Sequence, residues 1–192
     1  MNIIDKFHNW RRRLRWDKQY RNGRWNNLKN DKEKPRYQTI IEFSDKYGIN
    51  NPEVLDLGCG EGILCERMTS EKYTFFLGVD FSRVSINLAK NKNLGNAEFI
   101  TADLHSYRPD KKFDVIVFNE AFYYIHNSEK KNVLNTMKSC LKEKGIIINS
   151  IYREGIGCWE YFDAEDLEKL DFKTIMTADD KTYWKIGVYK KI

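Results

Sequence analysis

Three closely spaced glycines and an aspartate follow a short apolar run. The stretch VLDLGCGEG places glycines at 58, 60 and 62, and Asp56 comes two residues before the first of them. Glycine lets the backbone approach a ligand closely and adopt dihedral angles barred to other residues. A helix that begins near Glu61 would also offer free N–H groups at its N-terminus. The spacing therefore predicts a loop that cradles a ligand, with a glycine-rich turn that binds nothing as the lesser alternative.

The aspartate in this stretch indicates the charge of that ligand. A dinucleotide-binding loop would show GxGxxG, with a pyrophosphate on the helix N-terminus. Here the spacing is GxGxG, and the carboxylate of Asp56 would repel a diphosphate. A cationic ligand suits the position instead. S-adenosylmethionine, which carries a sulfonium and an ammonium, meets that requirement.

Two further carboxylates follow the next apolar runs. Asp80 ends FFLGVD, 22 residues after Gly58, where it could accept hydrogen bonds from both hydroxyls of a ribose, each worth about 1.5–3 kcal/mol. Phe81 could lie against an adenine face, and Asp103 in ITADL could accept from the adenine amine. Aspartate at a strand end is often only a helix cap. Three acids after three successive runs, beside the glycine loop, favour a ligand site.

The elements that must position these groups alternate along the chain. Short apolar or β-branched runs, typical of strands buried on both faces, are separated by segments of helical length. The expected strands are 54–58, 75–80, 97–101, 113–119 and 145–152, and the expected helices between them are 61–70, 82–92 and 128–143. Only HSYRPDKK separates the third strand from the fourth, so a helix there is short or absent. The last part predicts a helix over FDAEDLEKL, a strand over FKTIMTA and a final strand over TYWKIGVYKK. This pattern predicts an α/β fold with a Rossmann-like, doubly wound sheet.

The N-terminal segment differs from the rest in charge. Residues 1–38 hold 12 Lys or Arg against 4 Asp or Glu, and the remaining chain holds 21 against 24, within a net charge of +5. Apolar residues at 3, 7, 10 and 14 form one face of a helix, and a second helix over 36–47 follows Pro35. We expect 1–48 to form a helical basic cap or lid and 49–192 to form the ligand-binding domain. The charge fits an anionic partner such as RNA or a membrane surface, or a well-solvated surface helix.

Length and composition restrict the class of protein. The 192 residues suit one domain with one core. No apolar run approaches the roughly 20 residues of a bilayer span, and the N-terminus lacks the cleavage site of a secretory signal. The four cysteines show no CxxC or Cys/His spacing, so free thiols in the cytoplasm are expected. No His/Asp cluster has ligand spacing, and no metal is expected.

These motifs resemble those of class I S-adenosylmethionine-dependent methyltransferases. VLDLGCGEG is similar to the first motif, FLGVDFS to the second, ITADL to the third and FDVIVFNEAFYYI to the fourth, and LKEKGIIINS resembles the strand beyond. The match covers about residues 50–150, with the terminal strands plausible to 190. It implies a seven-stranded sheet, mostly parallel with an antiparallel last strand. It also implies that Asp80 binds the ribose, Asp103 the adenine, Gly58 and Gly60 the methionine portion, and Asp56 its ammonium.

The residues after the fourth strand, NEAFYYIH at 119–126, are expected to project into the acceptor space. Methyl transfer is an in-line displacement at a carbon that the sulfonium activates, so positioning, worth roughly 7–11 kcal/mol, is most of the work. His126 or Glu120 could act as a general base, and Tyr123 or Tyr124 could orient an acceptor. A capping or surface role suits His126 equally, and one tyrosine is expected to pack in the core. NEAF lacks the Asn/Asp-Pro-Pro-aromatic motif, which disfavours base-amine and glutamine methylation.

A second, looser resemblance concerns the N-terminal segment. RWDKQYRNGRWNNL and EKPRYQTI resemble the entry region of small-molecule methyltransferases, including relatives of the nodulation N-methyltransferase NodS. The resemblance would place five residues near the cleft: Trp16, Tyr20, Trp25, Arg36 and Tyr37. A cap packed only for stability is the alternative. Together with the motifs, the residues expected to contact the cofactor are Asp56, Gly58, Cys59, Gly60, Asp80, Phe81, Asp103, Leu104, Asn119, Trp25 and Tyr37.

The sequence therefore predicts methyl transfer from S-adenosylmethionine to an oxygen or nitrogen of a small metabolite, such as an amino sugar or a natural-product intermediate. One alternative is an RNA methyltransferase whose basic arm, with interleaved Trp10, Trp16 and Trp25, grips phosphates and stacks on bases. Another is a non-catalytic module that keeps the fold to bind the cofactor or a partner.

Overall fold

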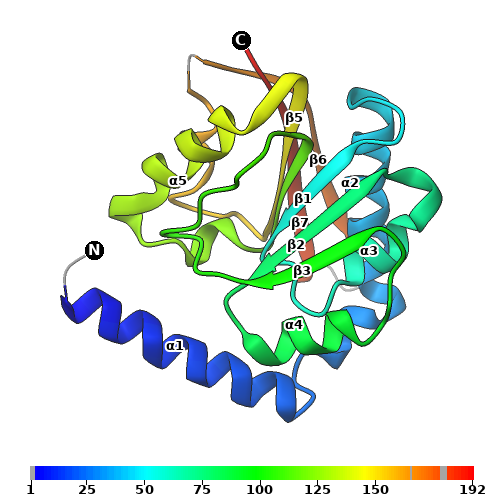
Figure 1. The fold of residues 1–192 in the computed structure, drawn as a ribbon. Coiled ribbons are helices and arrows are strands. Elements are labelled where there is room, and N and C mark those ends of the chain that lie inside the picture. Colours follow the sequence, from blue (N-terminus) through cyan, green and yellow to red (C-terminus); the bar gives the residue numbers. More distant parts are fainter. Residues whose placement is uncertain (1–2, 165, 178–180) are drawn as a thin grey trace.

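A seven-stranded sheet forms the centre of the computed structural model, which describes residues 3–164, 166–177 and 181–192 (Figure 1). The strand order is β3-β2-β1-β4-β5-β7-β6. β1 to β5 run parallel, and β7 is antiparallel to both β5 and β6. The strands are β1 (Glu53–Leu57), β2 (Phe75–Asp80), β3 (Ala97–Thr101), β4 (Phe113–Asn119), β5 (Leu141–Tyr152), β6 (Leu167–Met176) and β7 (Tyr183–Lys191). The predicted doubly wound α/β sheet with an antiparallel last strand is confirmed.

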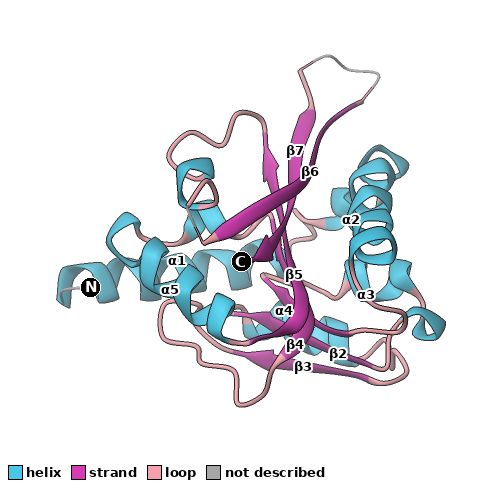
Figure 2. Ribbon diagram, turned by 90° about the horizontal axis from the view of Figure 1, so that it is seen from above, coloured by secondary structure: helices cyan, strands magenta, loops and turns pink. Residues whose placement is uncertain are grey.

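Helices cover both faces of the sheet (Figure 2). On one face, α2 (Lys34–Tyr47), α3 (Ile63–Met68) and α4 (Arg83–Lys90) pack on β1, β2 and β4. On the other face lies α5 (Asn127–Ser139). Helix α1 (Ile3–Arg21) stands apart from these layers and runs past the carboxyl ends of the strands (Figure 1). Short 3-10 turns cover Asn26–Lys29, Asp31–Glu33, Ser70–Lys72, Phe122–Tyr124 and Trp159–Tyr161.

The first and last residues of a strand follow the hydrophobic pattern of the sequence wherever that strand is buried on both faces. Every residue of β4 is buried, and β2 is buried except for its first residue. Burying a side chain of the Val, Leu, Ile or Phe type stabilises a fold by about 1.5–3 kcal/mol, so such runs leave little freedom in where a strand lies. The structure places β2, β3 and β4 at 75–80, 97–101 and 113–119, as predicted.

The predicted helix over FDAEDLEKL is wrong. A 3-10 turn ends at Tyr161, and β6 begins at Leu167 and pairs with β7 throughout its length. The pairing register shifts between Lys169 and Asp171, which is a β-bulge. A bulge interrupts the alternation of inward and outward side chains, so this strand shows no period of two in the sequence. The predicted strand FKTIMTA is the second half of β6, and its last residue, Ala178, lies outside the described residues.

The helix predicted over 128–143 ends early. α5 stops at Ser139, and β5 begins at Leu141, opposite Phe113 of β4. The pairing of β5 with β4 shifts register before it continues from Ile146 onward. The segment LKEKG is therefore the irregular first part of a strand, which pairing with β4 stabilises against its helix-favouring composition.

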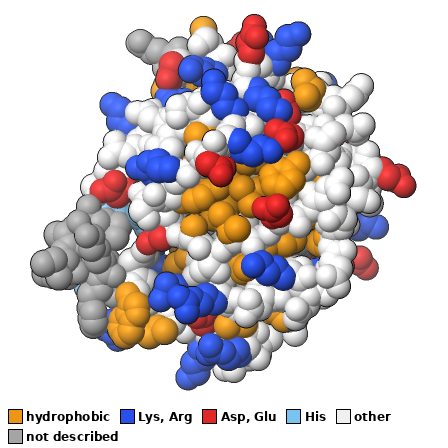
Figure 3. Space-filling model, in the orientation of Figure 1, with side chains coloured by type: hydrophobic (Ala, Val, Ile, Leu, Met, Phe, Trp, Pro, Cys, Tyr) orange, Lys and Arg blue, Asp and Glu red, His pale blue; other side chains and the backbone are white. Residues whose placement is uncertain are grey.

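The link between β3 and β4 carries no helix, as expected. It leaves part of the sheet face at β2 and β3 without a helical cover, and Phe75, Ile100 and Tyr107 pack there as partly buried side chains. Figure 3, in the same view as Figure 1, shows hydrophobic side chains gathered near the middle of the surface that faces the reader. In the described part of the chain, no helix has the length and apolar character that a bilayer crossing requires.

Helix α1 is confirmed, but the two described side chains of its predicted apolar face are largely exposed. The side chains of Trp10 and Leu14, on the predicted apolar face, are 49% and 46% exposed. The face turned toward the sheet is instead Asn9, Trp16 and Tyr20. The helix buries a mixed polar and aromatic surface, which a search for apolar periodicity does not detect.

Candidate active site

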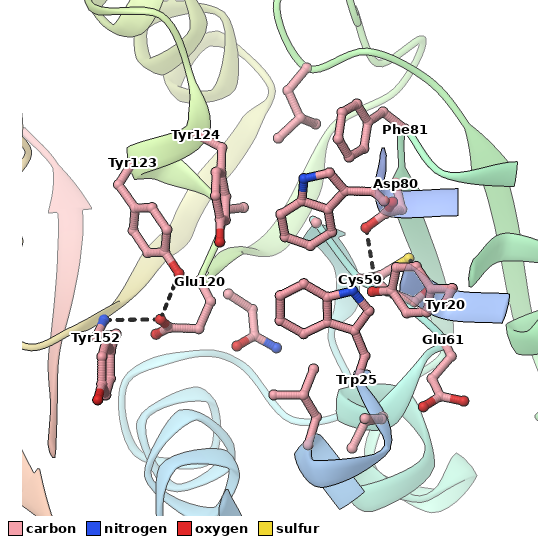
Figure 4. Close-up of a pocket in the computed structure, with 18 of the residues that line it drawn as sticks. Tyr20, Trp25, Cys59, Glu61, Asp80, Phe81, Glu120, Tyr123, Tyr124 and Tyr152 are labelled. Atoms are coloured by element: carbon pink, nitrogen blue, oxygen red, sulfur yellow. Dashed lines mark hydrogen bonds between the residues drawn. The ribbon is translucent and has the colours of Figure 1, made fainter. Parts of the chain in front are cut away.

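A cavity of about 430 Å³ lies at the carboxyl edge of the sheet, where the strand order reverses between β1 and β4. Ligands of doubly wound sheets bind at such a switch point. Figure 4 shows side chains converging on the cavity from several elements. Most of the predicted site residues line it: Trp25, Tyr37, Gly58, Cys59, Gly60, Asp80, Phe81, Asp103, Leu104, Asn119, Glu120, Tyr123 and Tyr124. Asp56 and His126 are not among the lining residues.

The glycine loop forms one wall of the cavity. Gly58 and Gly60 adopt φ of +80° and +55°, in the left-handed region that favours glycine. A Cβ atom on Gly58 would lie 2.5 Å from Cβ of Ala121, so no side chain fits there without movement. The N–H groups of Gly58 and Cys59 donate to the carbonyl of Val79, 2.7 and 3.1 Å away, which fixes the loop to β2. The loop has the backbone geometry that a close approach to a ligand requires.

Asp56 lies in β1 just before that loop. Its side chain is fully buried, and neither carboxylate oxygen has a hydrogen-bond partner within the described structure. Burial raises the pKa of this carboxyl to about 8, although Arg36 acts in the opposite direction. A buried carboxylate without a donor is costly unless a proton or a cation satisfies it. Asp56 does not itself line the cavity, so the position favours positive charge near this wall of the site.

Asp80 ends β2 and faces the cavity beside Phe81. Its carboxylate accepts from the N–H of Gly60, at 3.1 Å, and from the N–H of Ser82, at 2.8 Å. Burial raises the pKa of this carboxyl to about 6. Two backbone donors fix its orientation, and an ionised carboxylate can accept about four hydrogen bonds. It thus retains acceptor capacity for the hydroxyls of a ligand.

Asp103 follows β3 on the same edge. It accepts from the backbone N–H of His105, at 3.1 Å, and contacts Nδ1 of the same residue at 2.5 Å. The amide of Asn9, on α1, also donates to it. Burial acts to raise its pKa, but the hydrogen bonds from His105 and Asn9 outweigh this and hold the pKa below its usual value. The acid predicted to contact adenine therefore also holds α1 across the cavity.

Glu120 follows β4 in a left-handed backbone conformation, with φ of +58°. Its carboxylate accepts from the Tyr152 N–H at 2.9 Å and the Tyr123 hydroxyl at 3.1 Å (Figure 4). It also accepts from the Ser150 hydroxyl at 2.8 Å. Burial raises the pKa of Glu120, and the positive charge of Arg36 lowers it. The carboxylate is held rigidly at the cavity wall opposite the glycine loop.

The two tyrosines after Glu120 both line the cavity, and Tyr123, which is partly buried, also packs against the hydrophobic core, as expected of one of them. Phe122, directly before them, is the buried residue of that turn. Their ring centroids lie 4.4 Å apart, and Tyr124 is 37% exposed. The 3-10 geometry of this turn sends one aromatic residue inward and the next two toward the cavity.

His126 lies outside the lining of the cavity, where it is not placed to act as a general base. It is the N-cap of α5, and its Nδ1 lies 2.8 Å from the Ser128 hydroxyl and accepts from the Ser128 N–H at 3.4 Å. Its own backbone N–H donates to Nε2 of His105, 3.0 Å away. The capping alternative describes this geometry, and the ring has no contact with the cavity that would support proton transfer.

Arg36 is fully buried at the floor of the cavity. Its guanidinium pairs with the carboxylate of Glu33 at 3.0 Å and donates to the amide oxygen of Asn119. It also lies 4.1 Å from the ring centroid of Tyr37 and 5.7 Å from that of Trp184. A planar guanidinium held in this way can recognise a carboxylate with its remaining N–H groups.

Residues of the N-terminal segment line one side of the cavity. Trp16 of α1 stacks on Trp25, and its ring also meets Phe81 and Tyr124 edge-on, with centroids 5.8 and 4.9 Å away. Polar contacts anchor the helix at both ends of this aromatic group. Arg12 donates to the Tyr124 carbonyl at 2.7 Å, and the Ser82 hydroxyl donates to Asp17 at 2.6 Å.

Several lining residues were missed by sequence reasoning: Asn9, Arg12, Glu33, His105, Tyr152, Thr182 and Trp184. A signal existed for the first two. Asn9, Arg12, Trp16 and Tyr20 recur at intervals of three and four, which is one helical face, but its polar members conceal it. Three of the missed residues lie at the end of β5 or around the start of β7: Tyr152, Thr182 and Trp184. The pairing of these two strands brings them to the cavity, and residue spacing does not reveal that pairing.

Comparison with known proteins identifies the family. Residues 50–186 match the model of a methyltransferase domain family, and the chain belongs to that family. The recognition of the fold from its motifs is thereby confirmed.

Two curated relatives show how far the sequence similarity extends. A malonyl-[acyl-carrier protein] O-methyltransferase 2 of Ilyobacter polytropus is 34% identical over 141 residues, which cover 67% of this chain and 51% of that protein. A ubiquinone biosynthesis O-methyltransferase of Pasteurella multocida is 28% identical over 126 residues, covering 58% of this chain and 51% of that protein. The chain thus spans about half the length of the curated relatives it matches.

Two solved structures share the fold across most of the chain. The N-methyltransferase NodS of Bradyrhizobium japonicum, in complex with S-adenosyl-L-homocysteine, gives a TM-score of 0.75 at 16% identity and covers 87% of this chain and 91% of its own. The 1,6-didemethyltoxoflavin-N1-methyltransferase of Burkholderia thailandensis also gives 0.75 at 16% identity, covering 96% and 89%.

Proposed function

We propose that the protein transfers a methyl group from S-adenosylmethionine to an oxygen or nitrogen atom of a small metabolite. The observation that carries the proposal is the buried Asp56 carboxylate without a donor, directly before a glycine loop that admits no side chain. Ionisation of this buried carboxyl needs positive charge beside it, which a cationic cofactor supplies and an anionic one such as a dinucleotide does not.

The described residues fit S-adenosylmethionine group by group. Asp56 would balance its ammonium and Arg36 would bind its carboxylate. Asp80 would accept the ribose hydroxyls, and Asp103 and Phe81 would contact the adenine. When bound, the cofactor supplies a methyl carbon that its sulfonium activates toward nucleophiles.

The residues of the chain contribute mainly by positioning. The loop at Gly58 and the side chain of Asn119 hold the methionine end, and Tyr123 and Tyr124 line the space above it. Glu120, fixed by three donors, can hold or accept a proton at its carboxylate oxygens. Trp16 and Trp25 cover the cavity and exclude water from it.

The arrangement of α1 favours a small acceptor over RNA. One face of the basic helix lines the cavity, and its contacts with Asp103, Tyr124 and Ser82 hold it as a lid. The two curated relatives are O-methyltransferases, and the two solved structures are N-methyltransferases. We leave both acceptor atoms in the proposal for that reason.

The test uses S-adenosylmethionine labelled in its transferred methyl group. The purified protein is incubated with this cofactor and a cell extract of its source, and label is counted in the small-molecule, RNA and protein fractions. We expect label in the small-molecule fraction. Label confined to nuclease-sensitive material would contradict the proposal and make the N-terminal segment an RNA-binding arm. Label in no fraction would argue for a non-catalytic module.

A further inference from the structure

The end of the cavity farthest from Asp80 combines aromatic rings with a fixed carboxylate. Tyr123 and Tyr124 lie on one side of Glu120, and Tyr152 lies on the other (Figure 4). The Tyr152 ring centroid is 6.1 Å from that of Trp184, which also lines the cavity. Aromatic faces with a nearby carboxylate are the surroundings that bind organic cations. This end is where an acceptor must sit if the proposed function holds, because the glycine loop and Asp80 occupy the other end.

The charges at this end have a negative excess. Two carboxylates line it, Glu33 and Glu120, and the cation among them is Arg36. Arg36 already pairs with Glu33 and Asn119, and the carboxylate of the cofactor would take up its remaining donors. Among the described residues that line this end, an anionic acceptor would therefore meet the negative charge of Glu120 while Arg36 is already engaged.

The other arginines near this end do not change that balance. Arg12 lines the cavity on the lid side, where its guanidinium donates to the Tyr124 carbonyl. Arg153 lies 5.0 Å from the ring centroid of Tyr152 but is not a lining residue. Arg12 is thus engaged with the backbone of Tyr124, and Arg153 lies outside the lining of the cavity.

The carboxylate of Glu120 is held in a position where it can contact a bound cation. A non-glycine residue with φ of +58° is strained, by about 1–3 kcal/mol. Three hydrogen bonds hold the carboxylate in that strained position at the cavity wall. Ser150 takes one oxygen, and Tyr123 and Tyr152 share the other, which leaves acceptor capacity on the oxygen bound to Ser150.

We propose that the acceptor is an amine that enters as an ammonium ion, bound between the carboxylate of Glu120 and the rings of Tyr123, Tyr152 and Trp184. The inference rests on the proposed methyltransferase function and narrows it to N-methylation. Glu120 is a catalytic residue in this account, because it contacts the acceptor nitrogen.

The chemical step balances without a further reactant. The ammonium gives one proton to Glu120 or to water, which leaves a neutral amine with a lone pair. That lone pair forms the N–CH₃ bond while the C–S bond breaks, and the sulfur keeps the bonding electrons. The products are a methylammonium ion and neutral S-adenosylhomocysteine, and the aromatic rings favour the cation both before and after transfer.

Three probes of one shape and different charge test the proposal. Benzylamine is cationic at pH 7, benzyl alcohol is neutral and phenylacetate is anionic. The full chain is first titrated with S-adenosylhomocysteine by calorimetry, and the loaded protein is then titrated with each probe by NMR. We expect benzylamine to bind at least tenfold more tightly than phenylacetate. Equal affinities, tighter binding of phenylacetate, or no binding of any probe to the loaded protein would overturn the inference.

A matched pair of variants assigns the preference to Glu120. Glu120→Gln keeps the shape and most hydrogen bonds, and Glu143→Gln makes the same chemical change at an exposed position of β5. We expect the first variant to weaken benzylamine binding at least fivefold and to leave benzyl alcohol binding within twofold, and the second to change neither. An unchanged benzylamine affinity in Glu120→Gln would overturn the assignment. Failure of the wild type to bind S-adenosylhomocysteine would instead reject the proposed function itself.

Discussion

The indole rings of Trp16 and Trp25 lie almost parallel, with their centroids 4.6 Å apart and an angle of 8° between their planes. One ring belongs to α1, and the other belongs to the turn that leads toward α2. The stack holds α1 over the cavity, where Trp16 also meets rings from the ends of β2 and β4. The N-terminal segment is therefore joined to the site by its aromatic residues, and its arginines lie mostly on the outside.

Freeing the lid should speed release of the cofactor. Asp17 accepts from the Ser82 hydroxyl at 2.6 Å and from the Val84 N–H at 3.4 Å, at the start of α4. Hydrogen bonds to a charged group contribute about 1.5–3 kcal/mol, so Asp17→Ala should raise the dissociation rate of S-adenosylhomocysteine by about tenfold in stopped-flow fluorescence. Asp31→Ala, at an exposed position, is the control. Equal rates in the two variants would show that α1 does not gate the cavity.

Alanine substitutions at two glycines distinguish the cost of backbone strain from the cost of a steric clash. Gly58 and Gly157 have nearly the same φ, +80° and +77°. An added Cβ meets the Ala121 side chain at Gly58, whereas nothing lies within 4 Å of it at Gly157. Gly157→Ala should cost only the left-handed strain, about 1–2 kcal/mol of unfolding free energy. Gly58→Ala should cost more in denaturant unfolding and should abolish binding of S-adenosylhomocysteine. Similar losses in both variants, with binding retained, would contradict the role of the loop.

Binding of the cofactor should release a proton from Asp56. Burial raises the pKa of this carboxyl to about 8, so it is mostly protonated at pH 7 in the free protein. An ammonium beside it favours the ionised form and lowers the pKa in the complex. Affinity for S-adenosylmethionine should therefore rise as the pH approaches about 8, the pKa of Asp56 in the free protein, as long as the ammonium of the cofactor stays protonated.

Calorimetry at pH 7 in buffers of different ionisation enthalpy measures this proton directly. The wild type should release up to about one proton from Asp56 per cofactor bound. Asp56→Asn should not release this proton. If the wild type and Asp56→Asn release the same number of protons, Asp56 does not interact with the ammonium of the cofactor.

The sequence predicts the strands of the sheet well where burial on both faces requires a continuous apolar run. The motif residues of β1, β2 and β3 reach the cavity because parallel strands end at one edge, so Gly58, Asp80 and Asp103 could be placed together without a structure. The helix expected over residues 162–170 is wrong because a β-bulge interrupts the alternating pattern of the edge strand β6, which begins at Leu167. Local pattern does not reveal which strand supplies the pairing partner.

The acceptor end was less accessible to sequence reasoning. Glu120 and the two tyrosines follow a recognisable strand, but Tyr152 and Trp184 reach them through the pairing of β5 with β7. His126 seemed suited to catalysis by its chemistry alone, whereas the start of α5 uses its ring as a cap. Residue type indicates what a side chain can do, and only the packing decides where it is used.

The most direct test of the account is the affinity of S-adenosylmethionine for wild type and Asp80→Ala. The carboxylate ends β2 inside the cavity, oriented by the N–H groups of Gly60 and Ser82. If it accepts hydrogen bonds from the ribose hydroxyls, its removal should raise the dissociation constant at least tenfold, because each such bond contributes about 1.5–3 kcal/mol. An unchanged dissociation constant would mean that the cofactor does not lie against Asp80, and the proposed site would be wrong.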